Sequence, residues 1–113
     1  MNSSEAPLIY EVNLAVDLDI ADAYALWLEP HIKEMLGFDG FISAQWYERN
    51  AQDEGLSLLQ RHWTIHYGLQ SRHYYERYIN EHAPRMREDG LSKFAGKFQA
   101  TRRILLSFKK LRR

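Results

Sequence analysis

Alternating apolar and polar positions mark the first strand of the chain. In Leu8–Val16 every second residue is apolar, and the residues between them include Glu11 and Asn13. A period of two predicts a β-strand with one buried face and one more polar face. The same pattern predicts three further strands, at Phe41–Arg49, Leu56–Tyr67 and Phe98–Ser107.

Helical spacing of apolar residues predicts the segments between the strands. The first helix follows the acidic caps near Asp17. We expect Pro30 to bend or break it, because proline lacks an N–H donor and clashes with the preceding turn, and a second piece to follow at His31–Leu36. Two more helices are predicted, one from residue 71 to about residue 82 and one at Arg85–Phe94.

The order of these elements predicts the fold. Strand, helix, strand, strand, helix, strand makes two interleaved β-α-β units, which form an α+β ferredoxin-like βαββαβ domain: a four-stranded antiparallel sheet with helices on one face. We expect one domain over residues 8–108, with flexible termini at 1–7 and 109–113.

The other face of the sheet is predicted to be too apolar for water. Two such faces would pair into a homodimer, the dimeric α/β barrel, with a cavity between the sheets that could hold a small-molecule ligand. The apolar residues expected on this face are Ile9, Phe41, Tyr47, Leu58 and Leu105.

Composition excludes several classes of site. The chain has no cysteine, so it has neither disulfides nor thiolate ligands or nucleophiles, which fits a reducing cytoplasm. The segment MNSSEAPLIYEV lacks the pattern of a secretory signal, and no apolar run reaches the roughly 20 residues that cross a bilayer. We therefore expect a cytoplasmic protein without a membrane partner.

Charge is balanced overall but divided along the chain. Residues 1–92 hold seven Lys and Arg and all fifteen Asp and Glu, whereas residues 93–113 hold eight Lys and Arg and no acid. A basic end can bind nucleic acid or anionic lipid. It lacks the aromatic and glycine motifs of RNA-binding modules, so we expect it to pair with the acidic body, and an interaction role remains the alternative.

Several segments together resemble a small bacterial family that is known only as a domain of unknown function. They are IYEV, HIKEMLG and YINEHAPRMREDGLSKFAGKFQATRRIL. The resemblance covers most of residues 8–106 and implies a fold of the dimeric α/β barrel group. That group includes cofactor-free monooxygenases and isomerases as well as proteins that only bind ligands, so the resemblance supports the fold and not a particular chemistry.

The polar face of the sheet is the predicted site. We expect a cavity that binds a small molecule, or a cofactor-independent enzyme in which His62 is the base and Glu11 orients it. No cofactor is expected. The remaining candidate ligand-binding residues are Asn13, Gln45, Tyr47, His66 and Arg103, although Arg102 could take the place of Arg103.

Other chemistries have less support in the sequence. His62 and His66 share a strand face about 13 Å apart, too far to bind one metal ion, so no metal site is expected. A cluster around Pro84 could form an anion site at a helix start, but a helix–helix corner held by capping and surface ion pairs is the simpler explanation. Its members are His82, Arg85, Arg87 and Glu88. No serine lies in a nucleophile motif, and phosphate-binding loops are absent from the sequence.

Overall fold

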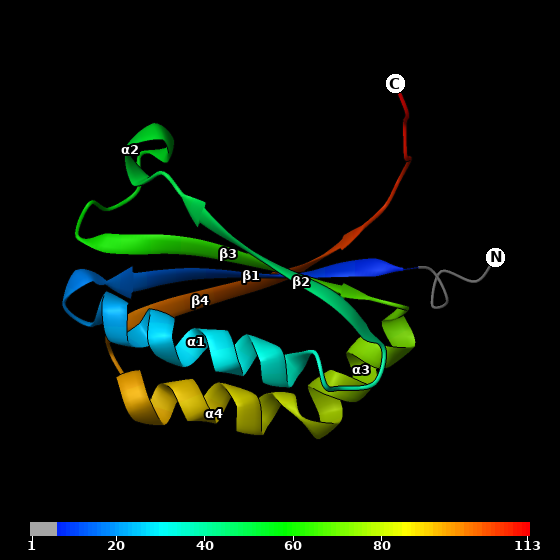
Figure 1. Ribbon diagram of the computed structural model, residues 1–113, viewed down its shortest axis with the longest axis horizontal. Coiled ribbons are helices and arrows are strands. Elements are labelled where there is room, and N and C mark those ends of the chain that lie inside the picture. Colours follow the sequence, from blue (N-terminus) through cyan, green and yellow to red (C-terminus); the bar gives the residue numbers. More distant parts are fainter. Residues whose placement is uncertain (1–6) are drawn as a thin grey trace.

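The computed structural model describes residues 7–113 and confirms the predicted ferredoxin-like fold (Figure 1). Four strands form one antiparallel sheet in the order β2-β3-β1-β4. The strands are β1 (Leu8–Asp17), β2 (Phe41–Arg49), β3 (Gln60–Leu69) and β4 (Phe98–Leu106). The predicted flexibility of residues 1–6 lies outside the described residues.

Helices cover one face of this sheet and leave the other face open (Figure 1). On the covered side, which we call the helix face, lie α1, α3 and α4, while the short α2 rises above the open face. A single 3-10 turn, η2 (Leu18–Ile20), leads into α1. The helices are α1 (Ala21–Met35), α2 (Ala51–Glu54), α3 (Arg72–Glu81) and α4 (Ala83–Phe94). Among the described residues, no helix is both long and apolar enough to cross a membrane.

The first helix continues through Pro30, so the predicted break is wrong. Proline removes the hydrogen bond to the carbonyl four residues back, which belongs to Leu26. Both residues lie on the solvent side of α1, where Leu26 is 80% exposed. Water can therefore satisfy the free carbonyl, and the buried stripe on the opposite side holds the helix together.

The third strand begins later than predicted. Asn50 accepts a hydrogen bond from the Asp53 amide and caps α2, and Gly55 ends that turn in the left-handed region at φ 68°. These turns take up chain that the alternating pattern had assigned to the strand. Leu58 consequently lies outside the sheet and is 69% exposed, so its predicted place on the open face is wrong.

A bulge in β2 corrects a second expectation about the open face. The register of β2 against β3 shifts between Phe41 and Ser43. Because a shift of one residue reverses the direction of every side chain before it, Phe41 points to the helix face. Its ring there packs against Tyr67 and Tyr78, with ring centroids 5.8 and 5.3 Å away.

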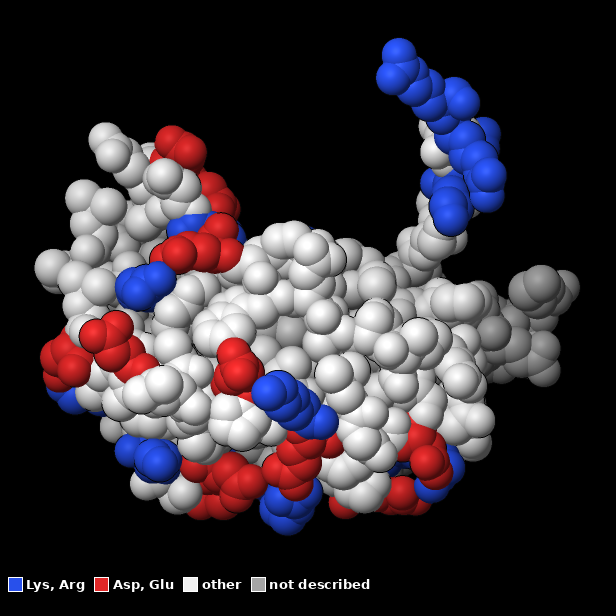
Figure 2. All heavy atoms as spheres, viewed as in Figure 1, with Lys and Arg blue, Asp and Glu red and all other residues white. Residues whose placement is uncertain are grey.

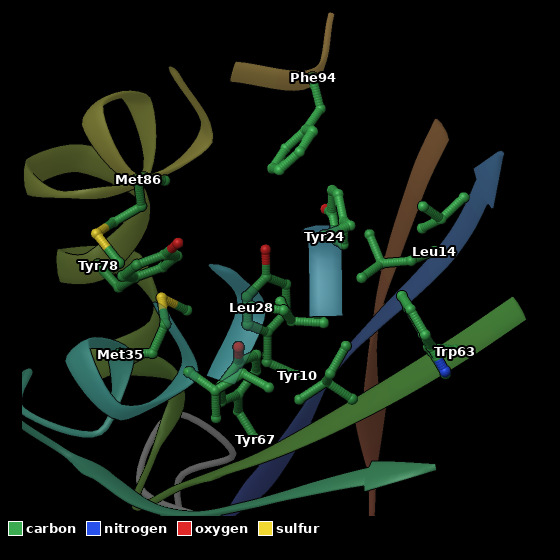
Figure 3. Packing of buried hydrophobic residues seen from close by; sticks show 14 of the residues in the cluster. Tyr10, Leu14, Tyr24, Leu28, Met35, Trp63, Tyr67, Tyr78, Met86 and Phe94 are labelled. Carbon is green, nitrogen blue, oxygen red and sulfur yellow. The ribbon is translucent and has the colours of Figure 1, made fainter. Parts of the chain in front are cut away.

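The hydrophobic core lies between the sheet and the helices (Figure 3). Alternate residues of β1 and β3 provide its floor, and one stripe from each of α1, α3 and α4 provides its roof. The largest fully buried side chains are Tyr10, Ile65, Leu69, Met86 and Val16. Tyrosine is unusually frequent in this core, which leaves several hydroxyl groups that need polar partners.

We predict that Gly40→Ala destabilises the protein more than Gly96→Ala does. Both glycines have left-handed backbones, at φ 83° and 79°, so each alanine carries the same penalty of about 1–2 kcal/mol. A Cβ at Gly40 would lie 2.1 Å from the Tyr74 ring, whereas nothing lies within 4 Å at Gly96. Urea unfolding should show an additional loss of about 1–3 kcal/mol for Gly40→Ala, and equal losses would contradict this packing.

Candidate functional site

A buried carboxylate stands at the centre of the open face. Glu11 on β1 is 5% exposed and lies between His66 on β3 and Arg103 on β4, because the strand register pairs it with both. One of its oxygens lies 2.9 Å from His66 Nε2, and the other accepts hydrogen bonds from Arg103 Nε and, at 2.9 Å, from Asn13 Nδ2. Thr64 extends this network by donating to Asn13 Oδ1 at 2.6 Å.

These donors keep Glu11 ionised. Burial alone would raise its pKa, but the hydrogen bonds from Arg103, Asn13 and His66 together lower the pKa to about 2. A carboxylate this acidic cannot accept a proton near neutral pH. Glu11 can instead fix the orientation of the His66 ring and hold three strands in register.

The predicted pairing of His62 with Glu11 does not form. The register places His62 opposite Ala15, four residue pairs along the ladder from Glu11 and His66. The His62 ring is 6% exposed, and its Nε2 lies 2.9 Å from the Ser57 carbonyl oxygen. The sequence alone could not choose between the two histidines, because the choice depends on how β1 and β3 are aligned.

The other predicted residues lie around the same network. Tyr47 packs edge-on against the His66 ring with centroids 5.3 Å apart, and Gln45 is the β2 residue paired with His66. Arg103 faces the open side, while Arg102 faces the helices, which decides the ambiguity between them. Within residues 7–113, no group of three His, Asp or Glu side chains is arranged to hold a metal ion.

A hollow that was not predicted from the sequence lies between the helices and the sheet. Its volume is about 230 Å³, and most of its wall is apolar. Figure 3 shows the hydroxyl groups of four tyrosines, from β1, β3, α1 and α3, directed toward this space. Those residues are Tyr10, Tyr24, Tyr67 and Tyr78. We call this space the helix–sheet cavity.

The cavity tyrosines are neutral hydrogen-bond donors. Burial raises the pKa of Tyr24, Tyr67 and Tyr78 well above the ordinary value of 10, so all three keep their protons. In the part of the chain that the structure describes, no side chain or carbonyl accepts from their hydroxyls. Since buried polar groups are nearly always paired, these hydroxyls suit a water molecule or a ligand inside the cavity.

Two arginines give the cavity its positive charge, and a histidine with a lowered pKa also lines it. Arg87 on α4 donates to the Tyr10 hydroxyl at 3.3 Å, and its Nε is buried without a partner. Arg102 on β4 lines the opposite wall, and neither guanidinium pairs with a carboxylate among residues 7–113. Burial lowers the pKa of His31, which also lines the cavity and stacks on Trp27 with centroids 4.5 Å apart.

The sequence does contain a signal for this cavity. Tyr10 and Tyr67 occupy core-facing strand positions where a purely structural core would prefer residues without a polar atom. Gly90 lies in the middle of α4, and a Cβ there would lie 3.1 Å from the Trp27 ring. Gly90 therefore lets the Trp27 ring pack closely against α4, and the polar tips of the two tyrosines are the part of the sequence that indicates the cavity.

The basic cluster near Pro84 is a structural corner, apart from Arg87. Arg85 forms ion pairs with Glu34 at 2.8 Å and with Asp89 at 3.5 Å, both at the surface. His82 stacks on Phe38 with ring centroids 4.1 Å apart. These contacts hold α1, α3 and α4 together, which agrees with the simpler of the two interpretations.

Comparison with known proteins identifies a family and a fold. The sequence model of a family described as "Domain of unknown function (DUF4286)" matches residues 7–108. No functionally curated protein matches the chain.

Three solved structures with similar folds share little sequence with this chain. The cofactor-independent oxygenase SnoaB from Streptomyces nogalater, in a mutant form, has a TM-score of 0.67 and 8% identity, covering 92% of this chain and 96% of its own. Rv0793 from Mycobacterium tuberculosis has a TM-score of 0.65 and 15% identity, with 93% and 98% covered. A conserved protein from Methanosarcina mazei has a TM-score of 0.65 and 13% identity, and the match covers 92% of this chain and 95% of that protein. These similarities establish the fold alone.

We predict that Glu11→Gln lowers stability at neutral pH. The folded-state pKa of about 2 lies below the ordinary 4.5, so the carboxylate stabilises the fold above about pH 4.5 and loses this effect as the pH falls toward 2. Allowing for the solvent exposure of Arg103, the loss at pH 7 should be about 2–3 kcal/mol. Urea unfolding at pH 7 and pH 3 measures it.

An exposed carboxylate provides the control for this experiment. Glu29 forms only a surface ion pair with Lys33. Glu29→Gln should therefore lower the free energy of unfolding by less than about 0.5 kcal/mol. Glu11→Gln should also flatten the acid dependence of the wild type, because the titrating group is gone. An unchanged acid dependence would mean that Glu11 is not the group that titrates.

Proposed function

The chain belongs to the DUF4286 family of unknown function, and we propose that it binds a small aromatic anion in the helix–sheet cavity. The observation that carries this proposal is the pairing of an apolar, tyrosine-rich cavity with two guanidinium groups that lack carboxylate partners. Arg87 is partly buried and Arg102 is exposed, so both keep donor groups that an anionic ligand in the cavity could bind.

The walls of the cavity suit an aromatic body. Tyr24, Trp27 and Phe98 form one continuous aromatic surface, with ring centroids 5.1–5.3 Å apart. Planar rings stack favourably on such surfaces. A volume of about 230 Å³ is below the roughly 300–1,000 Å³ of common ligand sites, so we expect a ligand of one or two rings.

The anionic group is expected at the end of the cavity where the arginines lie. Arg87 lines the cavity and donates to the Tyr10 hydroxyl, and the exposed Arg102 provides a second planar donor group. A guanidinium binds a carboxylate through two parallel hydrogen bonds, which gives both affinity and orientation. The tyrosine hydroxyls would donate to further oxygens of the ligand.

The proposal includes a homodimer formed through the open face. Half-buried Ile9 and Leu105 and the 41% exposed Tyr47 surround the Glu11 network, and a second sheet would cover them. In this assembly, residues predicted from the sequence would lie between the sheets, where their hydrogen bonds favour a role in register over one in ligand binding. We place this dimer in the cytoplasm, because the chain has no cysteine.

Proton transfer in the helix–sheet cavity is a second candidate function. Because burial lowers the pKa of His31, its ring is neutral at pH 7 and can accept a proton. The proton would pass from an acidic C–H of a bound ketone to His31. The electron pair would remain on the ligand as an enolate, whose oxygen Arg102 could stabilise. This step needs no cofactor, and SnoaB, of similar fold, is described as a cofactor-independent oxygenase.

We predict that 2-naphthoate binds to the protein and that Arg102→Met weakens its binding at least tenfold. A charge-assisted hydrogen bond contributes about 1.5–3 kcal/mol. Neutral 2-naphthalenemethanol forms no such bond, so its affinity should fall less than about threefold on Arg102→Met. Isothermal titration calorimetry of both compounds measures the difference.

Two variants serve as controls for the naphthoate experiment. Lys93→Met removes an equal charge from α4 outside the cavity and should leave both affinities unchanged. Arg103→Met removes the neighbouring arginine on the open face. If naphthoate binding were lost in Arg103→Met and kept in Arg102→Met, the ligand would bind on the open face instead, with Gln45, Tyr47 and His66 as its contacts.

For the second candidate function, we predict that the protein accelerates deuterium exchange at the acidic CH₂ of 2-tetralone. His31→Gln should slow this exchange about 100-fold or more, since a positioned base contributes 10²–10⁴-fold. The rate should decline on acidification only below the ordinary histidine pKa of 6.5. Proton NMR in D₂O measures the exchange rate as the decay of the CH₂ signal of 2-tetralone.

The base is identified by a matched pair of histidine variants. His62→Ala should keep the full exchange rate, because His62 is bonded to the Ser57 carbonyl on the open face. Loss of exchange in His62→Ala alone would restore the assignment made from the sequence. No acceleration by the wild type would remove the enzymatic candidate and leave ligand binding.

A further inference from the structure

The C-terminal arm, residues 107–113, extends away from the body of the protein. It follows β4 and rises from the open side of the sheet without touching its own helices (Figure 1). Its four cations, Lys109, Lys110, Arg112 and Arg113, form an isolated basic projection (Figure 2). Phe108, directly before them, is 98% exposed, and Leu111, between them, is 80% exposed. Large apolar side chains this exposed indicate a surface that a partner covers.

A second projection rises from the same side at the other end of the sheet. We call it the α2 corner, residues 50–59 between β2 and β3 (Figure 1). It carries Asp53, which has no cationic partner among residues 7–113, and Glu54, which is paired with Arg49. Its two leucines, Leu58 and Leu59, are 69% and 77% exposed. The α2 corner therefore has the chemistry that complements the arm: acidic groups beside exposed aliphatic ones.

Within one chain the two projections are separated by the length of the sheet. They stand at opposite ends of a molecule whose longest extent is 47 Å, while seven extended residues span at most about 25 Å. The arm also points away from the α2 corner (Figure 1). The complementary surfaces can consequently meet only between two molecules.

We propose that the arm of each subunit binds the α2 corner of a second copy of this chain. The inference rests on the proposed face-to-face dimer. Two sheets can pair about a two-fold axis along the strands or across them, parallel to the sheets in both cases. An axis along the strands would bring four cations of one arm against four of the other. An axis across the strands exchanges the ends, so that each arm meets an acidic, leucine-containing corner.

Charge provides the preference between these two arrangements. Like charges that face each other across an interface are costly, and opposite charges select the partner and its orientation. Leu58 and Leu59 would cover Phe108 and Leu111, and this contact would occur twice in a symmetric dimer. The arm would thus extend the interface beyond the two sheets and lock their relative orientation.

A charge-exchange experiment tests the contact. The arm variant Lys109→Glu with Lys110→Glu and the corner variant Gln52→Lys with Asp53→Lys should each weaken dimerisation about tenfold or more. The four changes combined should restore the dimer to within about threefold of the wild type, because opposite charges again face each other. Sedimentation equilibrium at 0.15 M salt gives the dissociation constants.

The control reverses the same number of lysines on the helix side. Lys33→Glu with Lys93→Glu changes the net charge as the arm variant does, and it should leave the dissociation constant within about threefold. Additive losses in the combined variant would overturn the contact while leaving the sheet-to-sheet dimer in place. A wild type that stays monomeric at 100 µM would overturn the proposed dimer itself.

Two other occupants of the arm are outcomes of the same test. The wild type is also tested for binding to phosphatidylserine vesicles and to a 20-nucleotide single-stranded RNA. If the arm variant loses such binding without weakening the dimer, the arm would be assigned to a membrane or to nucleic acid. Either result would overturn the proposal. Phe108→Ser should weaken the dimer in the wild-type background, which tests the apolar part of the contact separately from the charges.

Discussion

The Glu11 carboxylate is the interaction on which the rest of the sheet depends. It is buried on the open face and receives donors from β1, β3 and β4, so one side chain links three of the four strands. A slip in any of these strands would leave the charge unpaired, which costs far more than one lost hydrogen bond. The alignment of the sheet, and hence the side toward which each neighbouring residue points, is therefore fixed electrostatically as well as by the core.

That alignment divides the polar groups of the protein between two sides. On the open side the polar groups satisfy one another, and the network is closed except for the half-exposed ring of Tyr47 and its neighbours. On the helix side Tyr24, Tyr67 and Tyr78 line the cavity, and the Arg87 Nε is buried without a hydrogen-bond partner. A satisfied network favours structure and an unsatisfied one favours binding, which is why we assign the ligand to the helix–sheet cavity.

Sequence patterns were sufficient for the fold and insufficient for the site. The alternation in Leu8–Val16 and the order of elements fixed the βαββαβ fold, because these signals are local. The break expected at Pro30 did not occur because Pro30 lies on the solvent side of α1. Which side of a helix is exposed depends on how the helix packs against the rest of the fold, and the local sequence does not show it. The pairing of Glu11 with His66 instead of His62, and the hollow between helices and sheet, were not predicted for the same kind of reason: register and hollow space arise only from the packing of distant segments.

The adjacent arginines of β4 lie on opposite faces of the sheet and make different contacts there. Arg102 reaches the cavity and Arg103 reaches Glu11, because neighbours on a strand point to opposite faces. Inserting or deleting one residue in the strand would exchange the two, sending the partner of Glu11 into the core and the ligand contact to the outside. An insertion in the Ala95–Lys97 turn, in contrast, would leave both arginines on their own sides.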